Sequence, residues 1–265
     1  MKQFLRRYAP VCALAFGLMA VTACSKKEEA PVAAAKPSIY MVGVESAYAP
    51  FSSENEKKEV VGFDIEVMQA IAKKTGIEVK FIPTPFEGFF NFLAQGDRDL
   101  LISAITITDE RKQTVDFSTP YFEASQLIAV PQNNTTVKQF SDLKSLKIGV
   151  QSATTGDEVV QNLVGKNNPS IKRFDSTPLA LKELETGGVD AVVADDPVVK
   201  NYITNNPSAS FRVVADASFP KEYYGIAVRK GNTELLAKIN QGLADIKADG
   251  SFAKLNEKYF GSDKK

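Results

Sequence analysis

From residue 39 onward, short apolar segments alternate with amphipathic helical patterns. The pattern at Asp64–Thr75 places Ile65, Met68 and Ile71 on one face of a helix, which Gly76 ends. This alternation predicts the α/β class, with mostly parallel sheets flanked by helices. The segments expected to form strands are Ile39–Val44, Ile77–Ile82, Asp99–Ile102, Gln126–Val130, Lys147–Val150, Ile171–Phe174, Asp190–Val193 and Phe211–Val214. Further helices are expected at Phe86–Gln95, at Pro178–Glu185, from Asn232 onward and at Ser251–Phe260.

Two places in the chain share one arrangement. Near 99–103 and near 190–194, a helical pattern ends at glycine, an aspartate begins a buried strand, and small or polar residues follow the strand. Ligands of open α/β sheets bind beyond the carboxyl ends of the strands. The repeat therefore predicts two α/β lobes that face one cleft. After the second strand, Asp196-Pro197 is typical of a helix start, with Asp196 as the N-cap.

The chain contains no histidine, which removes several kinds of site. Ser-His-Asp and Cys-His catalytic groups, HExxH zinc helices and His-ligated haem are all excluded. The two cysteines are too few for a Cys-built zinc or iron–sulfur site. The 32 basic residues balance the 32 acidic ones, without the positive excess typical of nucleic-acid binding. We therefore expect no metal, no cofactor and no nucleic-acid partner.

Residues 1–23 have the parts of a secretory signal peptide. A short basic start precedes the apolar stretch Tyr8–Ala23, which is shorter than the ~20 residues of a membrane-spanning helix. A short membrane anchor is the alternative. The run Val21-Thr22-Ala23-Cys24 resembles the bacterial lipoprotein box, which implies that Cys24 becomes the first mature residue and carries lipid. A chance cysteine at an ordinary cleavage site is the other interpretation.

Residues 24–38 are expected to form the lipidated cysteine and a flexible tether, because they contain few large apolar side chains. Fully extended, the segment after Cys24 would reach about 46 Å. We therefore expect an exported protein that is lipid-anchored to a bacterial membrane. It would face the periplasm, or lie on the outer face of the cell membrane in a Gram-positive bacterium.

Six runs of residues occur in the order and spacing of one protein family. They are Gly62–Val67, Ile105–Lys112, Val115–Tyr121, Ile148–Gly156, Gly188–Asp195 and Tyr223–Val228. Over nearly all of residues 39–260, the chain resembles the polar amino-acid-binding proteins (solute-binding protein family 3) of bacterial ABC importers. Within that family it is most similar to arginine, basic amino-acid and glutamine binders. The resemblance implies an amino acid as ligand, an ABC permease with its cytoplasmic ATPase as partner, and a monomer that is not an enzyme.

The resemblance also implies the two-lobed type II periplasmic-binding-protein fold. The first lobe would comprise residues 39–127 and 225–265, and the second residues 128–224. Two hinge strands, near 127–132 and 221–228, would cross between the lobes. The ligand would lie between them, and the lobes would close on it by a hinge motion.

An α-amino acid presents a carboxylate and an ammonium group. A closed cleft must pair both, because an unpaired buried charge costs several kcal/mol. Arg111 offers a planar fork that matches a carboxylate, and it follows Thr108-Asp109-Glu110, a predicted helix start. A surface arginine paired with Asp109 or Glu110 is the alternative. The resemblance assigns Arg111 to the ligand carboxylate and Asp195 to its ammonium.

Nine further residues match the ligand pocket of the family. Thr154 and Thr155 precede a predicted helix, where N-capping is the alternative role. For the hydroxyls after the first buried strand the alternative is turn formation, and for the aromatic residues it is core packing. The other seven are Glu45, Tyr48 and Phe86 at the side-chain end, Gln151 facing them, and Ser103, Ala104 and Thr106 after the buried strand.

The identity of the ligand depends on Glu45. An extra carboxylate in the pocket would suit arginine or lysine, although glutamine or another polar amino acid is the alternative. An amino-acid sensor is a further possible role. The alternative of a different class is a periplasmic enzyme on the same fold, similar to cyclohexadienyl dehydratase, with Glu45 or Asp196 as the acid.

Overall fold

The computed structural model describes residues 39–261. The predicted signal peptide, Cys24 and the tether therefore lie outside the described residues. Within residues 39–261, no helix combines the length and the apolar character that crossing a membrane requires.

The first sheet has the strand order β5-β1-β6-β15-β7. Its strands are β1 (Ile39–Val44), β5 (Glu78–Pro83), β6 (Leu100–Leu101), β7 (Val115–Phe117) and β15 (Ala227–Arg229). Strand β1 pairs in parallel with β5 and β6, whereas β15 pairs antiparallel with β6 and β7. The sheet is thus mixed, because β15 enters it from the opposite direction.

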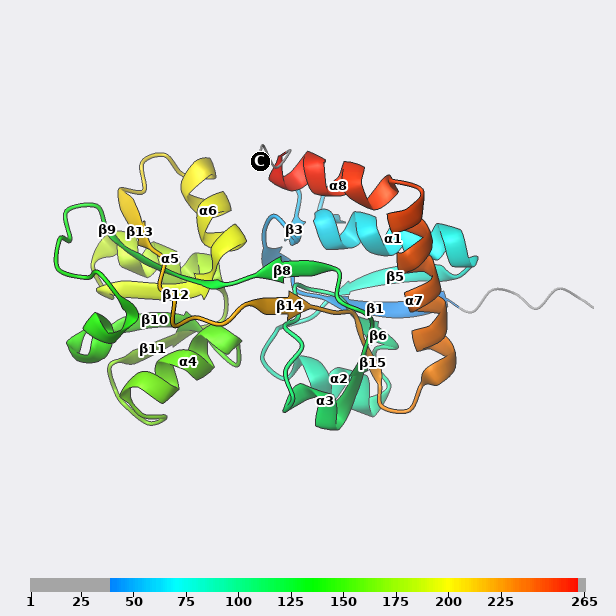
Figure 1. Ribbon diagram of the computed structural model, residues 1–265, viewed down its shortest axis with the longest axis horizontal. Coiled ribbons are helices and arrows are strands. Elements are labelled where there is room, and N and C mark those ends of the chain that lie inside the picture. The colour runs from blue at the N-terminus through cyan, green and yellow to red at the C-terminus, as the bar shows by residue number, and fades with distance from the viewer. Residues whose placement is uncertain (1–38, 262–265) are drawn as a thin grey trace, which may run out of the picture. The chain divides into compact units, whose positions relative to one another are not determined.

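Helices cover both faces of the first sheet (Figure 1). One side carries α1 (Phe63–Thr75), α7 (Thr233–Ala248) and α8 (Ser251–Phe260). Their apolar faces form a cluster with the strands, in which Met68, Ile71 and Ile239 are fully buried. The other side carries α2 (Phe89–Gln95) and α3 (Arg111–Thr114), with Leu93 buried beneath α2. Helix α2 begins three residues later than predicted, because Gly88 adopts a left-handed turn before it.

The second sheet repeats this plan with the order β11-β10-β12-β9-β13. Its strands are β9 (Gln126–Pro131), β10 (Ile148–Gln151), β11 (Ile171–Phe174), β12 (Ala191–Asp195) and β13 (Phe211–Val214). Strand β10 is parallel to β11 and β12, and β9 is antiparallel to β12 and β13. Separate apolar clusters lie on its two faces. The helices are η1 (Phe140–Ser145), α4 (Thr155–Val164), α5 (Thr177–Thr186) and α6 (Asp196–Asn205).

Two short strands join the lobes built on these sheets. Strands β8 (Phe122–Ala124) and β14 (Glu222–Tyr224) pair antiparallel with each other, between the two sheets (Figure 1). Strand β14 lies within the second predicted crossing segment. The first crossing was predicted too late, near 127–132, because Gln126–Pro131 already pairs within the second sheet.

A small three-stranded sheet lies between β1 and α1. It consists of β2 (Ala47–Tyr48), β3 (Ser52–Glu54) and β4 (Val60–Val61). Gly62 then leads into α1 with a φ of 138°, a region that favours glycine. A Cβ atom at this position would lie 2.3 Å from the carbonyl oxygen of Phe51, so the backbone approach itself requires glycine.

We predict that Gly62→Ala lowers the free energy of unfolding by at least about 2 kcal/mol, because it combines backbone strain with a backbone clash. The matched control is Gly76→Ala at the end of α1. Gly76 has a φ of 68°, and no atom lies within 4 Å of its would-be Cβ. The control should lose only about 1 kcal/mol. Urea unfolding measures both, and equal losses would contradict the role of the clash.

Candidate functional site

One pocket brings together all eleven residues predicted to bind the ligand. The space between its lining atoms is about 260 Å³, which includes open solvent. The first lobe contributes Glu45, Tyr48, Phe86, Ser103, Ala104, Thr106 and Arg111, and the second contributes Gln151, Thr154, Thr155 and Asp195. The structure thus places every one of these side chains at the predicted cleft between two lobes.

Strand ends position the pocket. Glu45 directly follows β1, Ser103 lies two residues after the end of β6, and Asp195 is the last residue of β12. The backbone N–H of Glu45 donates to Ser103 Oγ at 3.1 Å, which fixes these two strand ends to each other. The carboxyl ends of strands in both sheets therefore form the pocket, as the repeated pattern predicted.

Asp64 holds the backbone at Ala104, next to the pocket, by a hydrogen bond. Sequence analysis did not identify Asp64 as a site residue. It is fully buried on α1 and accepts hydrogen bonds from the Ala104 N–H (2.7 Å) and from the Tyr121 hydroxyl (2.9 Å). Ala104 has a φ of 48°, a costly value for a residue with a Cβ. Burial raises the pKa of Asp64 to about 7, against the lowering effect of its hydrogen bonds. An acid on the otherwise apolar face of α1 was the available signal.

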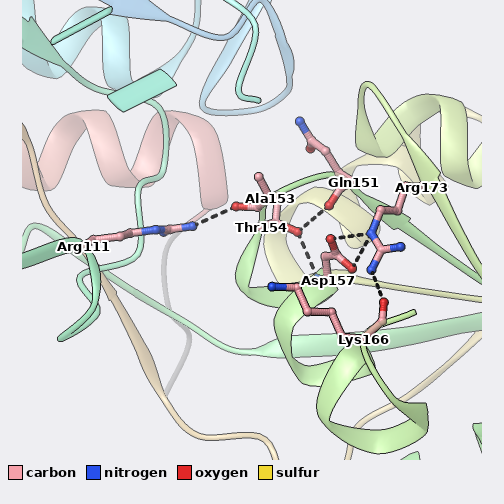
Figure 2. Close-up of polar contacts among 7 residues, drawn as sticks. All are labelled: Arg111, Gln151, Ala153, Thr154, Asp157, Lys166 and Arg173. Carbon is pink, nitrogen blue, oxygen red and sulfur yellow. Dashed lines mark hydrogen bonds and ion pairs between the residues drawn. The ribbon is translucent and has the colours of Figure 1, made fainter. Parts of the chain in front are cut away.

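Arg111 is buried, with only 7% of its surface exposed. Its guanidinium donates to the carbonyl of Thr106 (2.9 Å) and, across the cleft, to that of Ala153 (3.2 Å; Figure 2). The ring of Phe86 lies beneath it, 5.7 Å from the guanidinium carbon. Burial lowers the pKa of Arg111, and nearby carboxylates oppose this effect. The alternative of a surface arginine paired with Asp109 or Glu110 is wrong, because Arg111 is buried.

The helix that was predicted to start at Thr108-Asp109-Glu110 starts later in the structure. Helix α3 begins at Arg111 itself, and its N–H donates to Thr108 Oγ1 at 3.1 Å. Asp109 instead forms an exposed ion pair with Lys112 at 3.1 Å.

Asp195 accepts hydrogen bonds from three directions. Tyr48 of the first lobe donates at 2.7 Å, Tyr224 of β14 at 2.5 Å, and the Gln126 side chain at 2.6 Å. Burial raises the pKa of Asp195 to about 6; the charge of Glu222 adds to this, and the three hydrogen bonds oppose it. Because Tyr48 and Asp195 belong to different lobes, this carboxylate bridges the cleft.

Glu45 makes the second bridge. It accepts a hydrogen bond of 2.8 Å from the Gln151 side chain, which lies in the second lobe. Burial raises the pKa of Glu45 to about 7, while the bond from Gln151 lowers it. Thr177 donates to Gln151 Oε1 at 2.9 Å, and Gln151 Nε2 also reaches the Asp175 carbonyl at 3.3 Å. These contacts orient the Gln151 amide so that its nitrogen, and not its oxygen, faces Glu45.

Thr154 and Thr155 have separate roles. Thr154 is the N-cap of α4: its hydroxyl accepts from the Asp157 N–H (3.2 Å) and donates to the Gln151 carbonyl (2.8 Å; Figure 2). Thr155 instead donates to Glu222 at 2.9 Å. Thr154 therefore has the alternative role of N-cap, and it also lines the pocket.

The neighbouring acid Asp196 lies elsewhere. Asp195 occupies the N-cap position of α6, so Asp196 is the first helical residue and not the N-cap as predicted. Its carboxylate accepts from the Ser125 N–H (3.2 Å) and pairs with Lys200 (2.5 Å). Asp196 is not among the residues that line the pocket.

Buried charge in and beside the pocket is mainly negative. Glu45, Asp195 and Glu222 are all buried, and Arg111 is the single cation among the described residues that line the pocket. Glu222 and Gln126 come from the segments that join the lobes, and sequence analysis identified neither as a site residue. Within residues 39–261, no cluster of three or more His, Cys, Asp or Glu residues could hold a metal ion.

Comparison with known proteins shows the family of the chain. Residues 40–262 match the model of the bacterial extracellular solute-binding proteins, family 3. A probable histidine-binding protein of Neisseria gonorrhoeae is 41% identical over 95% of this chain and 94% of its own length. Its name describes a binding protein, not an enzyme.

Two solved structures share the fold and much of the sequence. The arginine-, lysine-, histidine-binding protein ArtJ of Geobacillus stearothermophilus has a TM-score of 0.82 and 41% identity, over 86% of this chain and 97% of its own. An ancestral arginine-binding protein bound to glutamine has a TM-score of 0.79 and 45% identity, over 84% and 98% of the two chains. The chain belongs to the bacterial extracellular solute-binding proteins of family 3.

Proposed function

We propose that the protein is the exported amino-acid-binding component of an ABC importer and that its ligand is a basic amino acid. The observation that carries this proposal is the charge arrangement of one buried pocket. Arg111 lies at one side, Asp195 is bridged to the opposite lobe, and Glu45 provides a further carboxylate. A free amino acid with a cationic side chain has three charges that match these three groups.

The backbone groups of the ligand would bind to Arg111 and Asp195. The guanidinium now donates to two backbone carbonyls, and a ligand carboxylate would provide stronger, charge-assisted acceptors. The ligand ammonium would join the donors around Asp195. Hydroxyls and backbone groups of Ser103, Ala104, Thr106, Thr154 and Thr155 surround this end.

The side chain of the ligand would extend toward Glu45, with Tyr48 and Phe86 as apolar walls. Gln151 presents N–H groups on this side, so Glu45 is the acceptor that a cationic side chain requires. Arginine, lysine and histidine are the ligands in the name of the ArtJ relative, and histidine is that of the Neisseria relative. Glutamine stays the second candidate, because the ancestral relative was solved with it.

The proposed role is binding without chemistry, followed by delivery to a membrane permease. Residues 122–124 and 222–224 would act as the hinge between a first lobe and a second lobe. Of the two acids considered for an enzyme of the dehydratase class, only Glu45 reaches the pocket. A role as an amino-acid sensor would use the same pocket.

Replacing Arg111 or Asp195 by Ala should weaken amino-acid binding by about 100- to 4,000-fold, because either change leaves a ligand charge unpaired in a buried site. Isothermal titration with L-arginine, L-lysine, L-histidine and L-glutamine measures the effect. Asp196→Ala is the matched control, since this adjacent acid does not line the pocket, and it should bind within about threefold of wild type. Affinity unchanged in both site variants would refute the assignment. Wild-type protein that binds no amino acid but converts a prephenate-like acid would favour the enzyme alternative.

The raised pKa of Glu45 predicts how pH separates two candidate ligands. A neutral ligand such as glutamine would keep Glu45 buried with a pKa near 7, above its ordinary value of 4.5. Glutamine binding would then take up a proton, so its affinity should fall as pH rises from 5 to 7.5. The positive charge of bound arginine would lower the pKa of Glu45 again, so the affinity for arginine should not fall in this way. The ratio of arginine to glutamine affinity should therefore rise about tenfold or more over this interval.

The control for this pH series is Glu45→Gln, in which the ratio should stay flat. Asp195 meets the ammonium of both ligands, so its titration cancels in the ratio. A wild-type ratio that does not change between pH 5 and 7.5 would contradict the role of Glu45.

We also propose that Cys24 carries a lipid anchor after removal of residues 1–23. The proposal rests on the lipoprotein-like run before Cys24 and on membership of an extracellular family. In cells, Cys24→Ser should move the protein from the membrane fraction to the soluble fraction and abolish incorporation of labelled fatty acid. Retention of label in this variant would refute the anchor.

A further inference from the structure

Glu222 is a buried carboxylate on a strand that connects the two lobes. It is 6% exposed, whereas the next residue, Tyr223, is 43% exposed. A charged side chain is thus turned inward on β14 while an aromatic one faces outward. A buried carboxylate is costly unless hydrogen bonds satisfy it.

Three donors satisfy this carboxylate, and they come from three parts of the chain. Thr106 of the first lobe donates its hydroxyl at 2.6 Å, and Thr155 of the second lobe donates at 2.9 Å, both to Oε2. The side-chain amide of Gln126 donates to Oε1 at 2.9 Å. One carboxylate therefore holds a hydroxyl from each lobe, and both hydroxyls belong to the pocket wall.

The Gln126 amide links this carboxylate to the ligand site. Its Nε2 lies 2.6 Å from Asp195 Oδ1 and 2.9 Å from Glu222 Oε1, so one N–H group can serve each carboxylate. Its Oε1 is buried and has no hydrogen-bond partner among the described side chains and backbone. A Cβ at Gly156 would lie 3.0 Å from that oxygen. The two carboxylates thus fix the orientation of the amide even at the expense of its own acceptor.

We propose that Glu222 is a positioning residue for amino-acid binding, which holds Thr106 and Thr155 together across the cleft and so stabilises the closed arrangement of the lobes. The proposal rests on the proposed binding function. Glu222 itself does not line the pocket, so it acts through the two hydroxyls. Because it contacts both lobes only when they meet, its loss should speed release of the ligand more than it slows capture.

The test is stopped-flow and titration binding with whichever of L-arginine, L-lysine and L-histidine wild type binds most tightly. Glu222→Gln should weaken binding about tenfold or more, mainly through faster dissociation. Glu222→Asp keeps the charge but withdraws it from the hydroxyls, and it should show the same faster release. Glu234→Gln is the control: it lies on α7, outside the pocket and the joining strands, forms an exposed ion pair with Lys238, and should behave as wild type.

A double-variant cycle separates positioning from general damage to the structure. If Glu222 acts through Thr155, then Glu222→Gln combined with Thr155→Val should cost little more than the larger single change. Losses that multiply fully would overturn the proposal, as would wild-type dissociation rates in both Glu222 variants. If Glu222→Gln fails to fold, the Asp variant and its cycle with Thr155→Val decide alone. Wild-type protein that binds none of the three amino acids would overturn the proposed function and this role together, whereas normal binding with unchanged rates overturns the role alone.

Discussion

The buried carboxylate of Asp195 imposes the strongest constraint on the arrangement of the two lobes. It ends a fully buried strand, and its three donors come from the first lobe and from the two segments that join the lobes. A carboxylate removed from water needs such partners, because its desolvation costs several kcal/mol. The donors can all reach it only when the lobes meet. The arrangement in which the lobes meet is therefore also the one in which the Asp195 carboxylate has all its hydrogen-bond donors.

An amino-acid ligand would change the character of that pairing. Tyr48, Tyr224 and Gln126 offer neutral dipoles to Asp195, and Gln151 offers one to Glu45. Burial raises the pKa of both carboxylates, and the hydrogen bonds from these neutral donors only partly oppose it. An ammonium or guanidinium group brings full positive charge to the same places. The excess of buried carboxylates over Arg111 thus favours closure around a ligand that carries more positive than negative charge.

The residues that line the pocket could be predicted from the sequence, but the residues that support them could not. Strand ends and the resemblance to the family identified Arg111, Asp195 and the nine other candidates. Glu222 lies on a strand of three residues, where the inward side chain is acidic and Tyr223 faces out. Hydropathy alone predicts the reverse. Its burial depends on Thr106 and Thr155, which are 116 and 67 residues away in the chain, so no local pattern could reveal it.

The same distinction applies to the sheets. The eight segments predicted as strands match observed strands within two residues, but local patterns missed the short strands β2, β3, β4 and β7. They also could not show that β9 and β15 run antiparallel to their neighbours. This direction follows from each strand entering its sheet by way of the crossing segments, β8 before β9 and β14 before β15. Helix–strand alternation predicts parallel pairing only for strands that stay within one lobe.

The antiparallel direction of β9 and β15 also brings the joining segments to the pocket. Because β9 runs against β12, its first residue lies opposite the last residue of β12, and Gln126 is in register with Asp195. Likewise β15 runs against β6, so the chain just before β15 passes the end of β6, where Thr106 forms a bridge with Tyr224. Parallel insertion would have placed both crossing segments at the opposite edges of the sheets, far from the strand ends that form the pocket. The segments that connect the lobes therefore reach the pocket for a topological reason, and a hinge motion there would alter the hydrogen bonds of Asp195 and Glu222.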